Sequence, residues 1–132
     1  MRNRRDFIST TAKGLGAMTI ISGATPAAAA PGQPVSFNVI YPNHEGARFD
    51  LAYYRSSHIP LVRRVMNPAK VVLIEGVPRG ASPAPYVMIA HMEFASSEAL
   101  EAALANPAMA DVRADVAKFT DIKQTIMFGT PL

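Results

Sequence analysis

The sequence has 132 residues, of which 13 are Lys or Arg and 10 are Asp or Glu, and it contains no cysteine. The absence of cysteine excludes disulfides, thiolate metal ligands and a thiol nucleophile. A chain of this length corresponds to one domain, with little room for a second.

The first 29 residues have the pattern of a twin-arginine signal peptide. Arg4 and Arg5 are followed by one spacer and two apolar residues, and residues 14–23 form a mildly apolar stretch. This stretch is too short to cross a bilayer as a helix, and Ala27, Ala28 and Ala29 supply the small residues typical of a cleavage site, with the cut after Ala29. We therefore predict removal of residues 1–29, export to the periplasm or the extracellular space, and no stable membrane insertion.

Removal of this segment changes the charge of the protein. Nine basic and nine acidic residues remain in the predicted mature domain, residues 30–132. Because that domain is formally neutral, its charge does not indicate binding to nucleic acid. The charged residues that leave with the segment are Arg2, Arg4, Arg5, Asp6 and Lys13.

The first half of the mature chain predicts one strand and one long helix. Residues 35–41 are mostly β-branched or aromatic, and Asp50 is a favourable N-cap for the helix that follows. Pro60 lies inside this helix, lacks an amide hydrogen and is expected to kink it. Spacings of three and four residues predict one buried stripe along the helix. Its members are Leu51, Tyr54, His58, Leu61 and Val65.

The second half predicts two strands before the next helix. Residues 71–75 form a short apolar run, and residues 76–85 are rich in glycine and proline, which is typical of an irregular connection. Residues 86–94 predict a long strand that is apolar on both faces apart from His91 and Glu93.

The remaining residues predict a broken helix and a last strand. Ser96 or Ser97 caps a helix that runs to Leu104, and residues 106–107 (Asn-Pro) end it and start a second helical piece that extends to Phe119. Residues 122–128 form the last strand.

The predicted order is βαββαβ, a ferredoxin-like α+β fold with both helices on one face of an antiparallel sheet. The strand at residues 86–94 is apolar on both faces, and two helices cover only one of them. The sheet therefore needs a second cover, and another copy of the chain is the simplest one. Residues 35–128 form the core of this domain. The domain is therefore expected to form a homodimer.

His58 is the residue most indicative of chemistry, because it lies on the predicted core stripe one turn after Tyr54. A buried histidine needs hydrogen-bond partners. Two interpretations remain open: a pocket acid, base or ligand-binding group, and a core histidine held by Tyr54 or by a residue of the sheet.

His91 and Glu93 are two residues apart and therefore share one face of a strand. Together with His58 they would supply two histidines and a carboxylate, a combination that binds iron in mononuclear enzymes. The alternative is a solvated or salt-bridged Glu93 at the strand end, and we predict no metal site. The chain also lacks phosphate-binding, Ser-His-Asp and dinucleotide motifs, so it identifies no cofactor.

Residues 41–62 (YPNHEGARFDLAYYRSSHIPLV) resemble the signature of the EthD family, in particular its reductase branch. Further similarity runs through PYV at residues 85–87, IAH at 89–91, ADV at 114–116 and FTDI at 119–122. Together these matches extend over nearly all of residues 35–128.

The resemblance implies a dimeric α+β barrel with an apolar pocket between helix and sheet. It favours an enzyme that acts on an apolar or aromatic small molecule by acid/base chemistry, classed by kinship as an oxidoreductase, with isomerase, cyclase and lyase reactions as alternatives. His58 and Tyr54 are then the expected catalytic residues, and Tyr53 and His91 the expected ligand-binding residues. The competing expectation is a non-catalytic module that binds a small ligand or supports a partner oxygenase.

Overall fold

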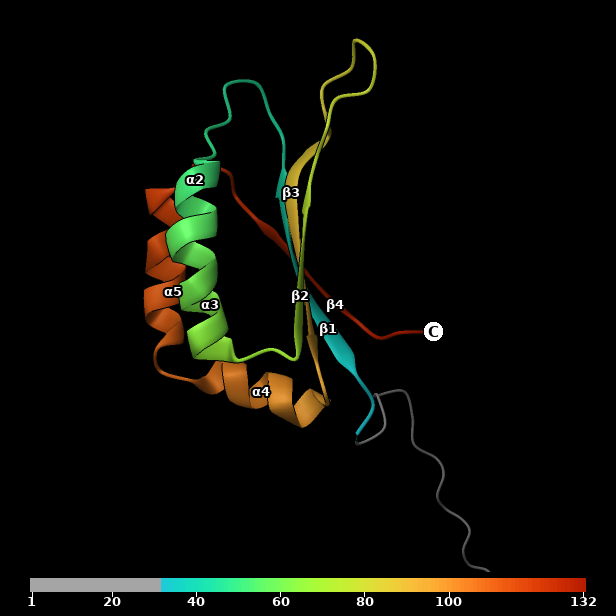
Figure 1. The fold of residues 1–132 in the computed structure, drawn as a ribbon, viewed down its shortest axis with the longest axis vertical. Coiled ribbons are helices and arrows are strands. Elements are labelled where there is room, and N and C mark those ends of the chain that lie inside the picture. Colours follow the sequence, from blue (N-terminus) through green and yellow to red (C-terminus); the bar gives the residue numbers. More distant parts are fainter. Residues whose placement is uncertain (1–31) are drawn as a thin grey trace, which may run out of the picture.

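The structure is a computed structural model that describes residues 32–132, so the predicted signal peptide lies outside the described residues. Four strands and a series of short helical segments alternate in the order predicted from the sequence (Figure 1). They are β1 (Val35–Pro42), α2 (Leu51–Tyr53), η3 (Tyr54–His58), α3 (Ile59–Met66), β2 (Lys70–Glu75), β3 (Tyr86–Phe94), α4 (Ser97–Ala105), α5 (Met109–Asp115), η4 (Val116–Lys118) and β4 (Thr125–Gly129).

The strands form one antiparallel sheet in the order β2-β3-β1-β4. The two longest strands, β1 and β3, are central and pair from Val35 with Phe94 to Tyr41 with Met88. This strand order, combined with the βαββαβ sequence of elements, confirms the predicted ferredoxin-like α+β fold.

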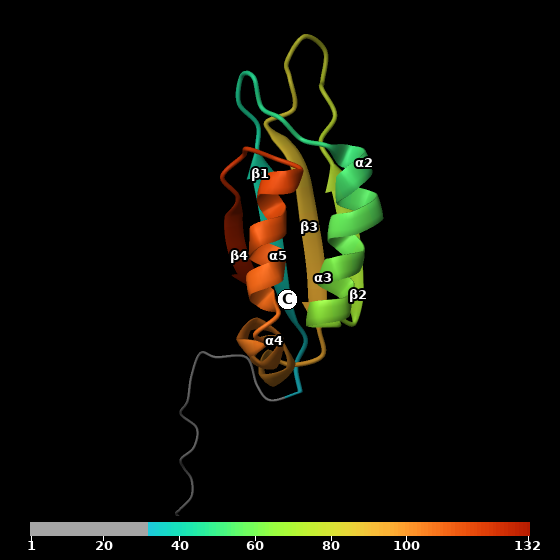
Figure 2. The same cartoon turned by 90° about the vertical axis from the view of Figure 1, so that its left-hand side faces the viewer.

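The helices cover one face of the sheet and leave the other open (Figure 1). Viewed from the helical side, α3 and α5 run side by side over the strands and α4 lies at one end (Figure 2). The connection between β2 and β3 projects beyond the opposite end of the sheet. None of the helices in residues 32–132 is long and apolar enough to cross a membrane.

The alternation of side chains along β3 assigns its two faces. Met88, Ala90, Met92 and Phe94 are buried under the helices, whereas Val87, Ile89, His91 and Glu93 are only partly buried on the open face. Thus the open face carries the odd-numbered residues of this strand.

The first long helix contains a π-helical turn, η3, where the sequence predicted a kink. Asp50 caps its N-terminus as expected, since its carboxylate accepts a hydrogen bond from the Tyr53 amide at 3.0 Å. Within η3 the Ile59 amide donates to the Tyr54 carbonyl, five residues back. Pro60 follows in the first turn of α3, where its missing amide hydrogen disturbs the helix least.

This wide turn changes which residues the helix buries. Tyr54 and His58 are buried as predicted, but Leu61 and Val65 are only partly buried, and so is Leu51. The extra residue in the turn shifts the following face by about 100°. The buried residues after His58 are therefore Ile59, Val62 and Met66.

The last elements differ from expectation in one boundary. Ser96 is the N-cap of α4, with its hydroxyl accepting from the Ala99 amide. The last strand begins at Thr125 and not at residue 122, because Ile122 is turned into the core. Its amide donates to the Thr120 hydroxyl, which itself donates to the Arg48 carbonyl at 2.6 Å.

Candidate functional site

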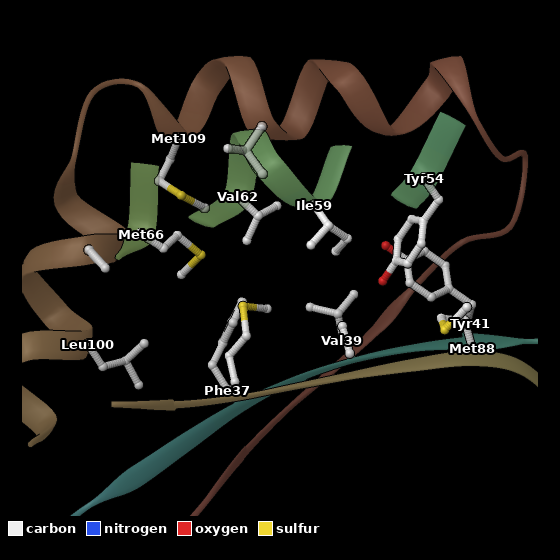
Figure 3. Close-up of a cluster of buried hydrophobic side chains, with 14 of the residues drawn as sticks. Phe37, Val39, Tyr41, Tyr54, Ile59, Val62, Met66, Met88, Leu100 and Met109 are labelled. Carbon is white, nitrogen blue, oxygen red and sulfur yellow. The ribbon is translucent and has the colours of Figure 1, made fainter. Parts of the chain in front are cut away.

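A small apolar cavity of about 60 Å³ lies between the helices and the sheet. Most of its walls are aliphatic or sulfur-containing side chains from β1, α3, β3 and α5, several of which are visible in Figure 3. The polar side chains at its wall are Tyr41, Tyr54, His58, Arg113 and Gln124.

His58 is 4% exposed and is held by a carboxylate from the other helix. Its Nδ1 atom lies 2.9 Å from Oδ2 of Asp115, at the last residue of α5. The second oxygen of this carboxylate accepts a hydrogen bond from the Tyr53 hydroxyl at 2.7 Å. The carboxylate therefore joins the π-helical turn to α5.

The hydrogen bonds around Asp115 define the charge of this pair. Burial alone would raise the pKa of Asp115, but hydrogen bonds from Tyr53 and His58 lower it overall, so the group is a carboxylate at neutral pH. The same contact raises the pKa of the Tyr53 hydroxyl, which stays protonated as the donor. Lys118 adds a weak ion pair to Asp115 at 3.8 Å.

A carboxylate can only accept, so His58 donates through Nδ1–H. Burial lowers the pKa of His58 despite the attraction of Asp115, and the ring is therefore neutral at neutral pH. In that tautomer Nε2 carries a lone pair. Among the described residues, no hydrogen bond occupies this atom, and the ring lines the cavity.

Tyr54 packs against His58 through the spacing of the π-helical turn. The two rings are nearly parallel, at 22°, with centroids 5.7 Å apart. Tyr54 is fully buried, and its hydroxyl has no hydrogen-bond partner of good geometry within residues 32–132.

The hydroxyl oxygens of Tyr54 and Tyr41 point the same way, into the space beside Ile59 and Val39 (Figure 3). Burial raises the pKa of both tyrosines, so each hydroxyl keeps its proton at neutral pH. The residues that line the cavity thus include two tyrosines with neutral O–H groups, Tyr54 and Tyr41, and a histidine with an unprotonated ring nitrogen.

Phe119 contacts the rings of both His58 and Tyr54 and helps to fix their positions. It is fully buried, and its ring centroid is 4.5 Å from that of His58 and 5.0 Å from that of Tyr54. Its carbonyl also accepts from the Asp50 amide at 2.7 Å. The segment after α5 thereby holds the start of the first helix in place.

His91 and Glu93 share one strand face, as predicted, and contact each other at 2.9 Å. This is the open face, on the opposite side of the sheet from His58. The three residues therefore cannot form one metal site, and the described part of the chain has no cluster of three or more potential ligands. The iron-type combination considered from the sequence is wrong because β3 turns its odd-numbered residues away from the helices.

His91 instead belongs to a polar row that crosses the open face. Its Nδ1 atom lies 2.7 Å from the Asn38 side-chain oxygen, and the Asn38 amide donates to the Ser36 hydroxyl at 3.0 Å. The row borders an open hollow of about 470 Å³ that includes Met127. Hence His91, expected to bind ligand, lies apart from the other three expected site residues, Tyr53, Tyr54 and His58.

Asp115 is the site residue that sequence reasoning missed. The interpretation of His58 as a held histidine named Tyr54 or a sheet residue as its partner, whereas the partner comes from α5. One signal was present: Met109, Val112, Asp115 and Phe119 are spaced by three, three and four residues, so an acidic residue falls on a buried helical stripe. Burial of an acid in such a stripe calls for a partner.

Comparison with known families matches residues 47–123 to the EthD domain. This match spans more than half of the chain and includes the whole His58, Asp115 and Phe119 constellation. The chain belongs to the EthD domain family. The EthD resemblance found in the sequence is thereby confirmed at the level of the family.

Solved structures agree with this assignment. An EthD-like protein from Ralstonia eutropha JMP134 is 29% identical, with a TM-score of 0.69 over 74% of this chain and 91% of that chain. An ethyl tert-butyl ether d (EthD) family protein from Bacillus halodurans C-125 is 19% identical, with a TM-score of 0.62 over 76% and 100% of the two chains.

A DABB family protein with a ferredoxin-like fold, from Mesorhizobium loti, shares the fold at 14% identity and a TM-score of 0.51, covering 75% of this chain and 97% of that chain. The comparison with curated proteins found no match. The similarities establish the family and the fold, while the chemistry of the site has to be argued from its residues.

Proposed function

We propose that this EthD-domain protein is a small enzyme that transfers protons to and from an apolar or aromatic small molecule, with His58 as the acid/base group. The observation that carries the proposal is the buried pair of His58 and Asp115, which leaves Nε2 of a cavity-lining imidazole without a hydrogen-bond partner among the described residues.

The pair has the parts that acid/base catalysis requires. Asp115 fixes the tautomer and the orientation of the ring, so the lone pair on Nε2 is directed away from the carboxylate. When Nε2 takes up a proton, the carboxylate stabilises the resulting imidazolium. Tyr53 contributes by donating to the other oxygen of Asp115, which keeps that group ionised.

Proton transfer is the chemistry that these side chains supply themselves, and it is common to isomerase, cyclase and lyase reactions. An oxidoreductase reaction remains the assignment suggested by kinship. Such a reaction would require an electron or hydride donor, and His58 would still transfer the accompanying proton.

The proposal can be tested by deuterium labelling, because a proton that His58 returns to the substrate comes from the solvent. A small-molecule extract is incubated with the protein in D₂O, and masses are compared with those from the His58→Gln and His44→Gln variants. We expect at least one compound to change mass or gain deuterium with the wild type and with His44→Gln, whose ring is exposed, but not with His58→Gln. Equal changes with His58→Gln would contradict the acid/base role.

A non-catalytic ligand-binding module is the second candidate. It is favoured by the apolar lining and by the unpartnered Tyr54 hydroxyl, since both suit a held ligand. Native mass spectrometry of the purified protein separates the two. A retained compound that is unchanged after incubation, with no His58-dependent product in the extract, would support the binding module.

We further propose that the protein is a homodimer that closes the open faces of two sheets on each other. That face carries the half-buried Val72, Ile89 and Ile40, and the exposed Ile74 and Met127. These apolar side chains flank the polar row of His91, Asn38 and Ser36, and apolar side chains that gather on one exposed face are typical of an interaction surface. A two-fold related copy offers a matching surface and converts the two sheets into a barrel.

Export by the twin-arginine route completes the proposal and rests on the sequence around Arg4 and Arg5, outside the described residues. The mature domain would then act in the periplasm or outside the cell.

A further inference from the structure

The cavity beside His58 holds a second set of polar atoms that the acid/base proposal does not use. The Tyr54 hydroxyl is buried and donates to no acceptor within residues 32–132, although the Tyr41 hydroxyl lies within reach of its oxygen, and Oε1 of Gln124 is buried without a donor. Both residues line the same cavity of about 60 Å³, together with Tyr41. Because the cavity is this small, a ligand group of a few heavy atoms would fill it and lie close to all three side chains.

A buried donor without an acceptor is costly, and a ligand acceptor removes that cost. The Tyr54 hydroxyl therefore calls for an oxygen on the ligand. This oxygen must belong to a neutral group, because the cavity walls are largely apolar and the only cation among the lining residues, Arg113, is exposed. A carbonyl on an apolar body meets these requirements, whereas a carboxylate would be buried without a counter-charge.

The position of His58 specifies what lies next to that carbonyl. Its ring is stacked on that of Tyr54, and its free Nε2 is the base at the same cavity. A base needs an acidic proton, and a neutral carbonyl acidifies the hydrogen on its adjacent carbon. The Tyr54 hydroxyl thus matches the carbonyl oxygen, and Nε2 of His58 matches the hydrogen on the adjacent carbon of the same functional group.

We propose that the substrate is an apolar ketone with an enolisable hydrogen, bound with its oxygen on the Tyr54 hydroxyl and its α-carbon against Nε2 of His58. This inference rests on the proposed acid/base function and names its substrate class. Tyr41 supports the same oxygen, since its hydroxyl points into the space beside that of Tyr54 (Figure 3).

The reaction balances without an added oxidant or reductant. Nε2 of His58 takes the α-hydrogen, the C–H electron pair forms the carbon–carbon double bond, and the carbonyl π pair moves to oxygen. The Tyr54 O–H then stabilises an enolate that carries more charge than the ketone did. Return of the proton to the same carbon exchanges it with solvent, and return to a conjugated carbon gives an isomer.

Gln124 favours a second oxygen on the ligand. Its amide presents an acceptor to a hydroxyl, or a donor to a carbonyl after the amide is rotated. A 1,3-dicarbonyl or a β-hydroxy ketone offers such a group, and a second carbonyl also makes the shared α-hydrogen more acidic. We therefore expect 1,3-oxygenated ketones to be turned over faster than simple ones.

The test uses the full-length protein and two small probes that suit the cavity, pentan-3-one and pentane-2,4-dione, in D₂O. Proton NMR follows loss of the α-hydrogen signal over the rate in buffer. We expect saturable acceleration by the wild type, no acceleration with His58→Gln, and a loss of about 100-fold in kcat with little change in KM for Tyr54→Phe. Tyr41→Phe should show a smaller loss in the same direction.

The matched control is Tyr86→Phe, which removes the hydroxyl of a tyrosine that is 46% exposed on β3 and should leave the exchange rate unchanged. Circular dichroism of each variant verifies that the fold is kept. Wild-type exchange that survives in both Tyr54→Phe and Tyr41→Phe would overturn the role of the hydroxyls. No exchange of either probe, together with a His58-dependent product in the extract, would overturn the ketone alone, whereas the loss of both would overturn the acid/base function as well.

Discussion

Nδ1 of His58 lies 2.9 Å from Oδ2 of Asp115, so two residues that are 57 positions apart form one buried hydrogen-bonded pair. The contact joins η3 to the end of α5, and it links the protonation of the site to the packing of the two helices. Changes of pH should therefore affect the stability of the whole domain.

The first prediction concerns acidification. The pKa of His58 is lowered below its ordinary value of 6.5 by burial, so unfolded chains bind this proton more readily than folded ones. The stabilising contribution is complete above pH 6.5 and is lost as the pH falls through the folded value. We expect the thermal midpoint of unfolding to decrease from pH 7 towards pH 5.

Thermal denaturation of variants over the same pH range identifies the group that causes this pH dependence of the thermal midpoint. His58→Gln should reduce the change of the thermal midpoint between pH 7 and pH 5. Asp115, whose pKa is lowered below 3.8, adds a separate loss only at more acidic pH. An unchanged pH dependence in His58→Gln would rule out this ring as the titrating group.

The second prediction separates stability from activity at Tyr54. Its hydroxyl is buried and donates to no acceptor in the described residues, which costs about 1–3 kcal/mol. Tyr54→Phe removes that cost and keeps the ring contacts with His58 and Phe119. Urea denaturation should show a gain in the free energy of unfolding of about 1 kcal/mol, even though the proposed activity falls. A loss of stability would mean that the hydroxyl is satisfied in the folded protein.

The third prediction distinguishes the two faces of β3. Met88 is 2% exposed beneath the helices, so Met88→Asp should unfold the protein at a cost of several kcal/mol. Ile89 is partly buried on the open face, so Ile89→Asp should preserve the helical circular dichroism signal and produce a monomer.

Analytical ultracentrifugation of the wild type at micromolar concentration is the reference for that comparison. We expect a dimer mass for the wild type and a monomer mass for Ile89→Asp. A stable, soluble wild-type monomer would refute the proposed barrel.

The fourth prediction concerns the segment before the described domain. Replacing Arg4 and Arg5 with lysine should block the twin-arginine route, leaving unprocessed protein in the cytoplasm. Cell fractionation and immunoblotting measure the shift. Continued export of the double variant would show that another route carries the protein.

The order of elements was predictable from the sequence because their signals are local. Asp50 caps a helix by bonding an amide three residues on, and the run at residues 86–94 is continuous. The shift of the buried stripe from Leu61 and Val65 to Val62 and Met66 was not predictable, since regular 3.6-residue periodicity contains no π-helical turn.

In the candidate site, too, residues with local sequence signals were predictable and residues placed by tertiary packing were not. Tyr54 and His58 were found because they are four residues apart on one helix. Asp115 was missed because its contact with His58 depends on how two helices pack, which spacing along one helix does not define. The face of His91 was also undetermined, since both faces of its strand are apolar and alternation gives no direction.

Phe119 determines the point during translation at which the candidate site can form. Its ring holds those of His58 and Tyr54, and its carbonyl binds the Asp50 amide, yet it follows both residues by more than 60 positions in the sequence. A nascent chain that stops before residue 119 has the imidazole but neither its aromatic support nor the closed helix start. The folded site therefore forms only after residue 119 has been synthesised. Transport of a folded domain would then have to wait until this residue has left the ribosome.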